Sequence, residues 1–167
     1  LLSDVVGDDP ASVASGPSVL PTRSPGLGRR TLERLGLWSA VPASVREALS
    51  QPAPPATVDS PPANLILARN ADLLSAAAAE ARRLGFRVQV LTERLQGEAS
   101  TVGARLGRRL RSSASPVCLL AGGETTVTLR RGGRGGRNQE LALSAAPSLD
   151  GVDRVLLASF ASDGIDG

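Results

Sequence analysis

The segment 132–137 places arginine among glycines directly before a helical pattern. Its residues are Gly132, Gly133, Arg134, Gly135, Gly136 and Arg137. The glycines leave backbone N–H groups uncovered by side chains, and a helix expected over 138–146 directs its positive dipole end toward them. The guanidinium groups of Arg134 and Arg137 can each donate paired hydrogen bonds to phosphate or carboxylate. The segment therefore predicts an ordered anion-binding loop, although it contains neither a Walker lysine nor the Gly-x-Gly-x-x-Gly spacing of dinucleotide sites.

Carboxylates occur in two further loops that follow apolar runs. Asp4 lies within the apolar start of the chain, where an aspartate is costly unless it is paired or hydrogen-bonded. Asp163 and Asp166 lie in the motif SDGIDG, after the apolar run 155–160. Such groups can bind Mg²⁺, orient a hydroxyl or accept a proton, whereas a plain turn is the alternative for 162–167. Asp8 and Asp9 are better interpreted as a solvated residue and a helix cap.

A third loop, Gly122-Gly123-Glu124, separates two strand-like runs by two glycines. Glycine there permits a positive φ or close approach of another group to the backbone. The spacing also suits a hairpin, which would make the sheet mixed. Glu124 remains a candidate for the site. Asn138 and Glu140 lie in the first turn of the expected helix, where they can simply cap it.

Hydrophobic periodicity places these loops in an α/β fold with a mixed, largely parallel sheet. A short turn over 11–14 and two short helices over 28–37 and 42–49 come first. The segment 51–62 holds five prolines, so we expect a linker there that separates a domain over 1–60 from a second over 61–167. In the second domain the pattern predicts strands over 64–68, 87–91, 117–121, 125–129 and 155–160, and helices over 71–84, 98–110 and 138–146.

Composition narrows the class of protein. The chain has 167 residues, of which 41% are hydrophobic and 2% aromatic, so the core must be aliphatic. All 19 basic residues are arginine, but the net charge is only +3. The lone Cys118 excludes an internal disulfide, and the chain has no long apolar run, so we expect a soluble, cytoplasmic protein without a membrane partner. An arginine-glycine nucleic-acid binder is the weaker alternative, because there is one such unit and no aromatic residue near it.

Four motifs in order resemble the glycerate 2-kinases of the MOFRL family: SDVVGDDPASVASGP, CLLAGGETTVTL, GRGGRNQELAL and SDGIDG. They begin at residues 3, 118, 133 and 162. The resemblance implies two α/β domains with a site in the cleft between them. It also implies phosphorylation of D-glycerate at O2, with ATP and Mg²⁺ as cofactors. The chain would then be the end of the first domain and most of the second, and inactive in isolation because the family's lysine and upstream glycine-rich loop lie outside it.

The resemblance also implies roles for single residues. Asp4, Arg137 and Asp163 would be catalytic, and Asp4, Asp163 and Asp166 would bind the metal. The nucleotide would contact Gly133, Arg134, Gly135, Gly136, Glu124 and Asn138. Some family members carry the name hydroxypyruvate reductase, an NAD(P)H-dependent alternative for which the sequence has no dinucleotide motif. The oligomeric state stays open, and a homodimer is compatible with the sequence.

Overall fold

The computed structural model describes the chain apart from residues 4, 20–25, 53–61, 115, 130–132, 163, 165 and 167. The elements are β1 (Leu2–Ser3), the 3₁₀ turn η1 (Val13–Ser15), α1 (Leu27–Arg34), α2 (Ala43–Ser50), β2 (Ala68–Arg69), α3 (Asn70–Arg83), β3 (Arg87–Leu95), α4 (Ala99–Arg111), β4 (Val117–Gly123) and α5 (Arg137–Leu149). None of the helices in this described part is long and apolar enough to cross a lipid bilayer.

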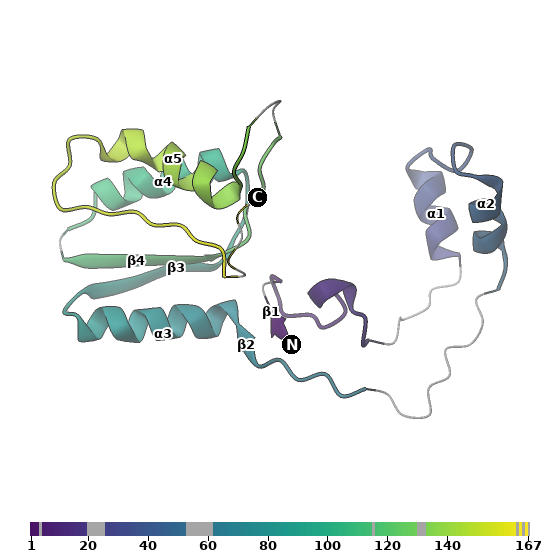
Figure 1. Cartoon of the computed structure of the whole chain (residues 1–167), viewed down its shortest axis with the longest axis horizontal. Helices are drawn as coiled ribbons and strands as arrows, with labels where there is room; N and C mark the ends of the chain where they lie inside the picture. Colours follow the sequence, from purple (N-terminus) through teal and green to yellow (C-terminus); the bar gives the residue numbers. More distant parts are fainter. Residues whose placement is uncertain are drawn as a thin grey trace.

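Strands β3 and β4 form a parallel pair joined by α4, which is a β–α–β unit. Arg87 lies opposite Val117, and Val90 lies opposite Leu120. Figure 1 shows α3 on one side of this pair and both α4 and α5 on the other. The α/β class with parallel pairing is thereby confirmed, as are the helices expected over 71–84, 98–110 and 138–146 to within a few residues. Because parallel strands end at the same edge, the loops after β3 and β4 lie together.

Helices α4 and α5 pack closely because small residues line their contact (Figure 1). A side chain at Gly103 would overlap the carbonyl oxygen of Leu141, and one at Gly107 would come within 2.8 Å of the Ala145 oxygen. The adjoining core is aliphatic, with Ala99, Val102 and Leu141 almost fully buried. This packing fixes where the first turn of α5 lies relative to the sheet.

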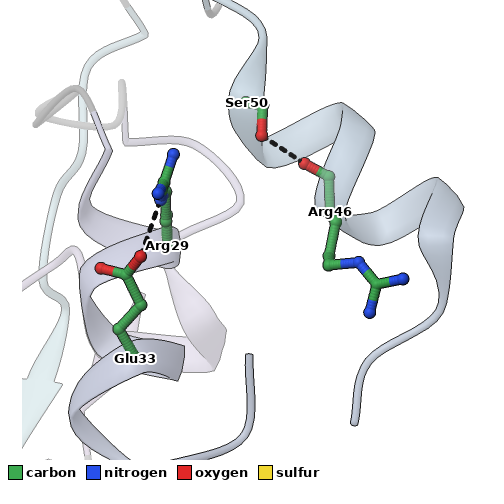
Figure 2. Close-up of polar contacts among 4 residues, drawn as sticks. All are labelled: Arg29, Glu33, Arg46 and Ser50. Carbon is green, nitrogen blue, oxygen red and sulfur yellow. Dashed lines mark hydrogen bonds and ion pairs between the residues drawn. The ribbon is translucent and has the colours of Figure 1, made fainter. Parts of the chain in front are cut away.

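The start of the chain contacts the segment before α3, whereas α1 and α2 contact each other. β1 pairs in parallel with β2, so the start of the chain lies beside the start of α3. Figure 2 shows the side-chain contacts within α1 and α2: Arg29 Nε lies 2.8 Å from Glu33 Oε1, and Ser50 Oγ donates to the Arg46 carbonyl. Neither helix contains a buried residue. The Asp9 carboxylate accepts the Ala11 N–H at 3.1 Å, which confirms the expected cap before a short turn.

Four sequence expectations are wrong or only partly met. No hairpin forms at Gly122-Gly123, and 125–129 is not a strand. Instead Thr126 accepts the Ala99 N–H and donates its own N–H to the Gly97 oxygen, so the start of α4 binds this segment. Gly123 has φ +146°, and a Cβ there would overlap the Leu95 backbone. The segment 155–160 forms no ladder, and the strand expected over 64–68 shortens to β2.

Candidate active site

The candidate site lies where β4 ends and α5 begins. Glu124 directly follows β4, and Arg137 is the first residue of α5. Arg137 Nη2 lies 3.2 Å from Glu124 Oε1, and the two side chains are 39% and 51% exposed. An ion pair this exposed contributes only about 0–1 kcal/mol to stability. The guanidinium of Arg137 can therefore exchange its carboxylate partner for another anion at small cost.

Asp166 caps the N-terminus of α5 from 28 residues further along the chain. Its Oδ1 accepts the Asn138 backbone N–H at 2.9 Å and the Asn138 Nδ2 amide at 3.1 Å. Its Oδ2 accepts the Gln139 backbone N–H at 2.9 Å. Helix N-termini leave such N–H groups without partners inside the helix, and a carboxylate there also meets the positive end of the dipole. The helix end expected to bind an external anion thus already binds one of the chain's own carboxylates.

The pKa of Asp166 lies below its ordinary value. The largest cause is the hydrogen bond from the Asn138 backbone, and partial burial opposes it. The bonds from Gln139 and the Asn138 side chain and the charge of Arg137 lower the pKa further. All of these contacts stabilise the ionised carboxylate, so Asp166 carries its negative charge at neutral pH.

The amide of Asn138 is fixed at both ends. Its Nδ2 donates to Asp166, while its Oδ1 accepts the hydroxyl of Ser159 at 2.6 Å. Ser159 lies in the segment 155–160, so this chain of hydrogen bonds joins that segment, α5 and the SDGIDG motif. Sequence reasoning missed Ser159, although a hydroxyl inside an otherwise apolar run was a signal that it had a partner nearby.

The glycines before α5 have different roles. A Cβ on Gly136 would lie 2.7 Å from Asp166 Oδ1, so the cap requires glycine there. Gly135 has φ +119° and lies against the Gln139 amide, whereas a Cβ on Gly133 would meet nothing within 4 Å. Gly136 is therefore the glycine that fits against Asp166, whereas Gly133 and Arg134 are exposed.

A pocket of about 300 Å³ adjoins these residues. Glu124, Arg137 and Asn138 form a polar part of its wall. Much of the remaining lining is apolar and comes from α3, β4 and the segment 156–161. The lining includes the second half of β4 and residues 156–162. A ligand that contacts Arg137 would therefore meet a largely apolar surface there.

The structure brings together Glu124, Arg137, Asn138 and Asp166, while Gly136 adjoins them. Asp4 and Asp163, expected to be catalytic and to bind a metal, lie outside the described residues. Among the described residues no three acidic or cysteine side chains gather closely enough to bind a metal ion. Asp166 binds the helix end in this arrangement, and the metal-binding role expected for all three aspartates stays a prediction.

Comparison with known proteins gives consistent results over different parts of the chain. Residues 117–167 match the MOFRL family model, and residues 1–50 match the model of a domain of unknown function, DUF4147. The whole chain aligns at 37% identity with glycerate 2-kinase from Pyrococcus horikoshii, covering 41% of that protein. A protein of Agrobacterium vitis with the provisional name hydroxypyruvate reductase is 35% identical over 99% of this chain and 45% of its own length.

A solved structure supports the same relationship. The crystal structure of glycerate kinase from Thermotoga maritima superposes with a TM-score of 0.70 and 31% sequence identity. The match covers 91% of this chain and 37% of the other. The chain therefore spans about two-fifths of the length of these relatives.

Proposed function

We propose that the protein this chain comes from is a glycerate 2-kinase of the MOFRL family, because residues 117–167 match the MOFRL model and the whole chain aligns with a glycerate 2-kinase. The reaction would transfer the γ-phosphoryl group of ATP to O2 of D-glycerate. The observation that carries the proposal is the alignment of the whole chain, at 37% identity, with a glycerate 2-kinase. The same proposal includes a cytoplasmic location and a homodimer. It also includes a domain boundary at 51–62 and a site between the two domains.

The transfer forms a bond between O2 of glycerate and the γ-phosphorus and breaks the bond from that phosphorus to the bridging oxygen of ADP. The hydroxyl proton passes to a base. Catalysis of such a step rests on positioning and on stabilising the charge on the phosphoryl oxygens. The protein must therefore provide oriented cations and hold the two reactants in line.

Arg137 suits the first task. Its planar guanidinium can donate two parallel hydrogen bonds to phosphate oxygens, and its present partner Glu124 is a half-exposed carboxylate that a polyphosphate can displace. Arg134, which is exposed, can add a second cation. We assign Arg137 to the transferred phosphoryl group and Arg134 to the nucleotide phosphates or the glycerate carboxylate.

The aspartates suit the second task, which is to hold the two reactants in line. Asp4 and Asp163 are assigned to the glycerate hydroxyl, as proton acceptor or orienting group, and to Mg²⁺. When bound, Mg²⁺ would neutralise charge on the nucleotide phosphates and help to hold them. Carboxylate oxygens are the ligands this ion prefers. Asp166 is engaged with α5, so we assign the metal first to Asp4 and Asp163.

The alternatives fit less well. A nucleic-acid-binding arginine-glycine segment is expected to lack tertiary contacts, yet Gly136 and Arg137 contact Asp166 and Glu124. A hydroxypyruvate reductase needs a dinucleotide site, and the loop before α5 lacks its glycine spacing. Incubating the full-length protein with D-glycerate, ATP and Mg²⁺ and identifying the product tests the kinase. Oxidation of NAD(P)H by hydroxypyruvate, without a phosphorylated product, would favour the reductase.

A further inference from the structure

We infer that Asp166 is a positioning residue that acts through the first turn of α5 to hold Arg137 in its phosphate-binding position. This inference rests on the proposed function, because it assigns Asp166 a part in the same reaction. It differs from the metal-binding role expected from the resemblance, because Asp166 would act on the protein rather than on a ligand.

The contacts of Asp166 surround Arg137 in the chain. Immediately after Arg137, the backbone N–H groups of Asn138 and Gln139 both donate to the carboxylate at 2.9 Å. Immediately before it, the Cα of Gly136 lies so close that a methyl group would come within 2.7 Å of Oδ1. Asp166 thus fixes the backbone on both sides of Arg137, while Glu124 contacts the guanidinium at the other end of the side chain.

The loop on its own would not hold this position. Four glycines in 132–136 give the backbone wide conformational freedom, so the path into α5 must be determined by contacts from elsewhere. The Gln139 side-chain amide adds a further contact, donating to the Asp166 carbonyl at 3.3 Å. A displacement of a catalytic group by about 1 Å can reduce the rate about 100-fold, so such contacts affect catalysis directly.

The geometry also explains why the residue at position 166 is a carboxylate rather than a neutral capping residue. Three donors converge on two oxygens, and an asparagine at this position would turn an NH₂ group toward at least one of them. Asp166→Asn keeps the size of the side chain but removes one of the two oxygens that accept these hydrogen bonds. Gly136→Ala keeps the carboxylate and pushes it away from α5, so the two variants disturb the same contact in different ways.

The test is a double-mutant cycle in the full-length protein. Steady-state kinetics with ATP and D-glycerate are measured for the wild type, Asp166→Asn, Arg137→Ala and the double variant. We expect Asp166→Asn to lower kcat about 10-fold or more with a smaller change in KM, and to have almost no further effect when Arg137 is already alanine. Equal losses in both backgrounds, or wild-type kinetics for Asp166→Asn, would overturn the inference.

Two further measurements keep the result interpretable. Hydrogen exchange of the amides of 137–141 should be faster in Asp166→Asn and in Gly136→Ala than in the wild type, and unchanged exchange in both would also overturn the inference. Asp150→Asn, the same substitution at the opposite end of α5, is the matched control and should leave kinetics and exchange unchanged. If the wild type phosphorylates no glycerate, the proposed function fails, whereas the exchange result still shows whether Asp166 holds the loop.

Discussion

At the scale of single residues, the candidate site is one arginine between two carboxylates. Glu124 contacts the guanidinium of Arg137, and Asp166 binds the backbone that carries it. The sequence could single out all three, because each lies in a polar loop after an apolar run. It could not show that Asp166 would bind the helix end, since that contact spans 28 residues and depends on how the chain returns to α5.

Replacing Arg137 by alanine should lower kcat by about 100-fold or more, because removing one donor to the charge of a transition state typically costs this much. Stability should change little, since the lost ion pair is half exposed. Kinetics and thermal unfolding of the full-length protein measure both effects. Arg83→Ala, which removes an exposed ion pair with Glu80 on α3, is the control and should leave the kinetics unchanged. Full activity of Arg137→Ala would refute its assignment.

The stability of the protein should also depend on the charge of Asp166. Its pKa is lower in the folded chain, mainly through the Asn138 N–H, than the value of about 3.9 expected when unfolded. The carboxylate therefore contributes its full stabilisation above about pH 5, and this contribution is lost as the pH falls below 4 and through the folded pKa. In chemical unfolding measured in EDTA, the wild type should have a higher free energy of unfolding than Asp166→Asn. This difference should become smaller as the pH falls. A difference in the free energy of unfolding that does not change with pH would show that the charge of Asp166 does not contribute to stability.

At the scale of elements, local patterns predicted the helices better than the strands. Periodic apolar positions and terminal signals were sufficient for α3, α4 and α5. For Gly122-Gly123 the sequence left both a hairpin turn and a close backbone approach open, because both require glycine, and the position of Leu95 confirms the close approach. The segment 155–160 has an apolar pattern typical of a strand, but pairing depends on a neighbouring edge that local sequence does not specify.

The close packing of α4 on α5 gives a prediction at this scale. Gly103→Ala should destabilise the protein by about 1–3 kcal/mol, because the added methyl overlaps the Leu141 carbonyl, a backbone group that cannot easily move. Helix propensity alone favours alanine by up to about 1 kcal/mol, so the sign of the change identifies the packing effect. Thr101→Ala, at an exposed position of α4, is the control and should be neutral or slightly stabilising. Chemical unfolding measures the change in the free energy of unfolding. If Gly103→Ala stabilised the protein, this would contradict the close contact between α4 and α5.

At the scale of the whole molecule, the described residues leave large apolar side chains exposed, among them Leu156 and Phe160 beside the candidate site. Since the chain spans about two-fifths of its relatives, tests of activity belong on the full-length protein.

The most direct test of the account is to identify the product that the full-length protein forms from D-glycerate, ATP and Mg²⁺. Phosphorus NMR distinguishes a phosphate ester at O2 from one at O3, and omission of ATP or of D-glycerate provides the control. We predict 2-phosphoglycerate and ADP in equal amounts. Formation of 3-phosphoglycerate, or no phosphorylated product while hydroxypyruvate is reduced at the expense of NAD(P)H, would contradict the account.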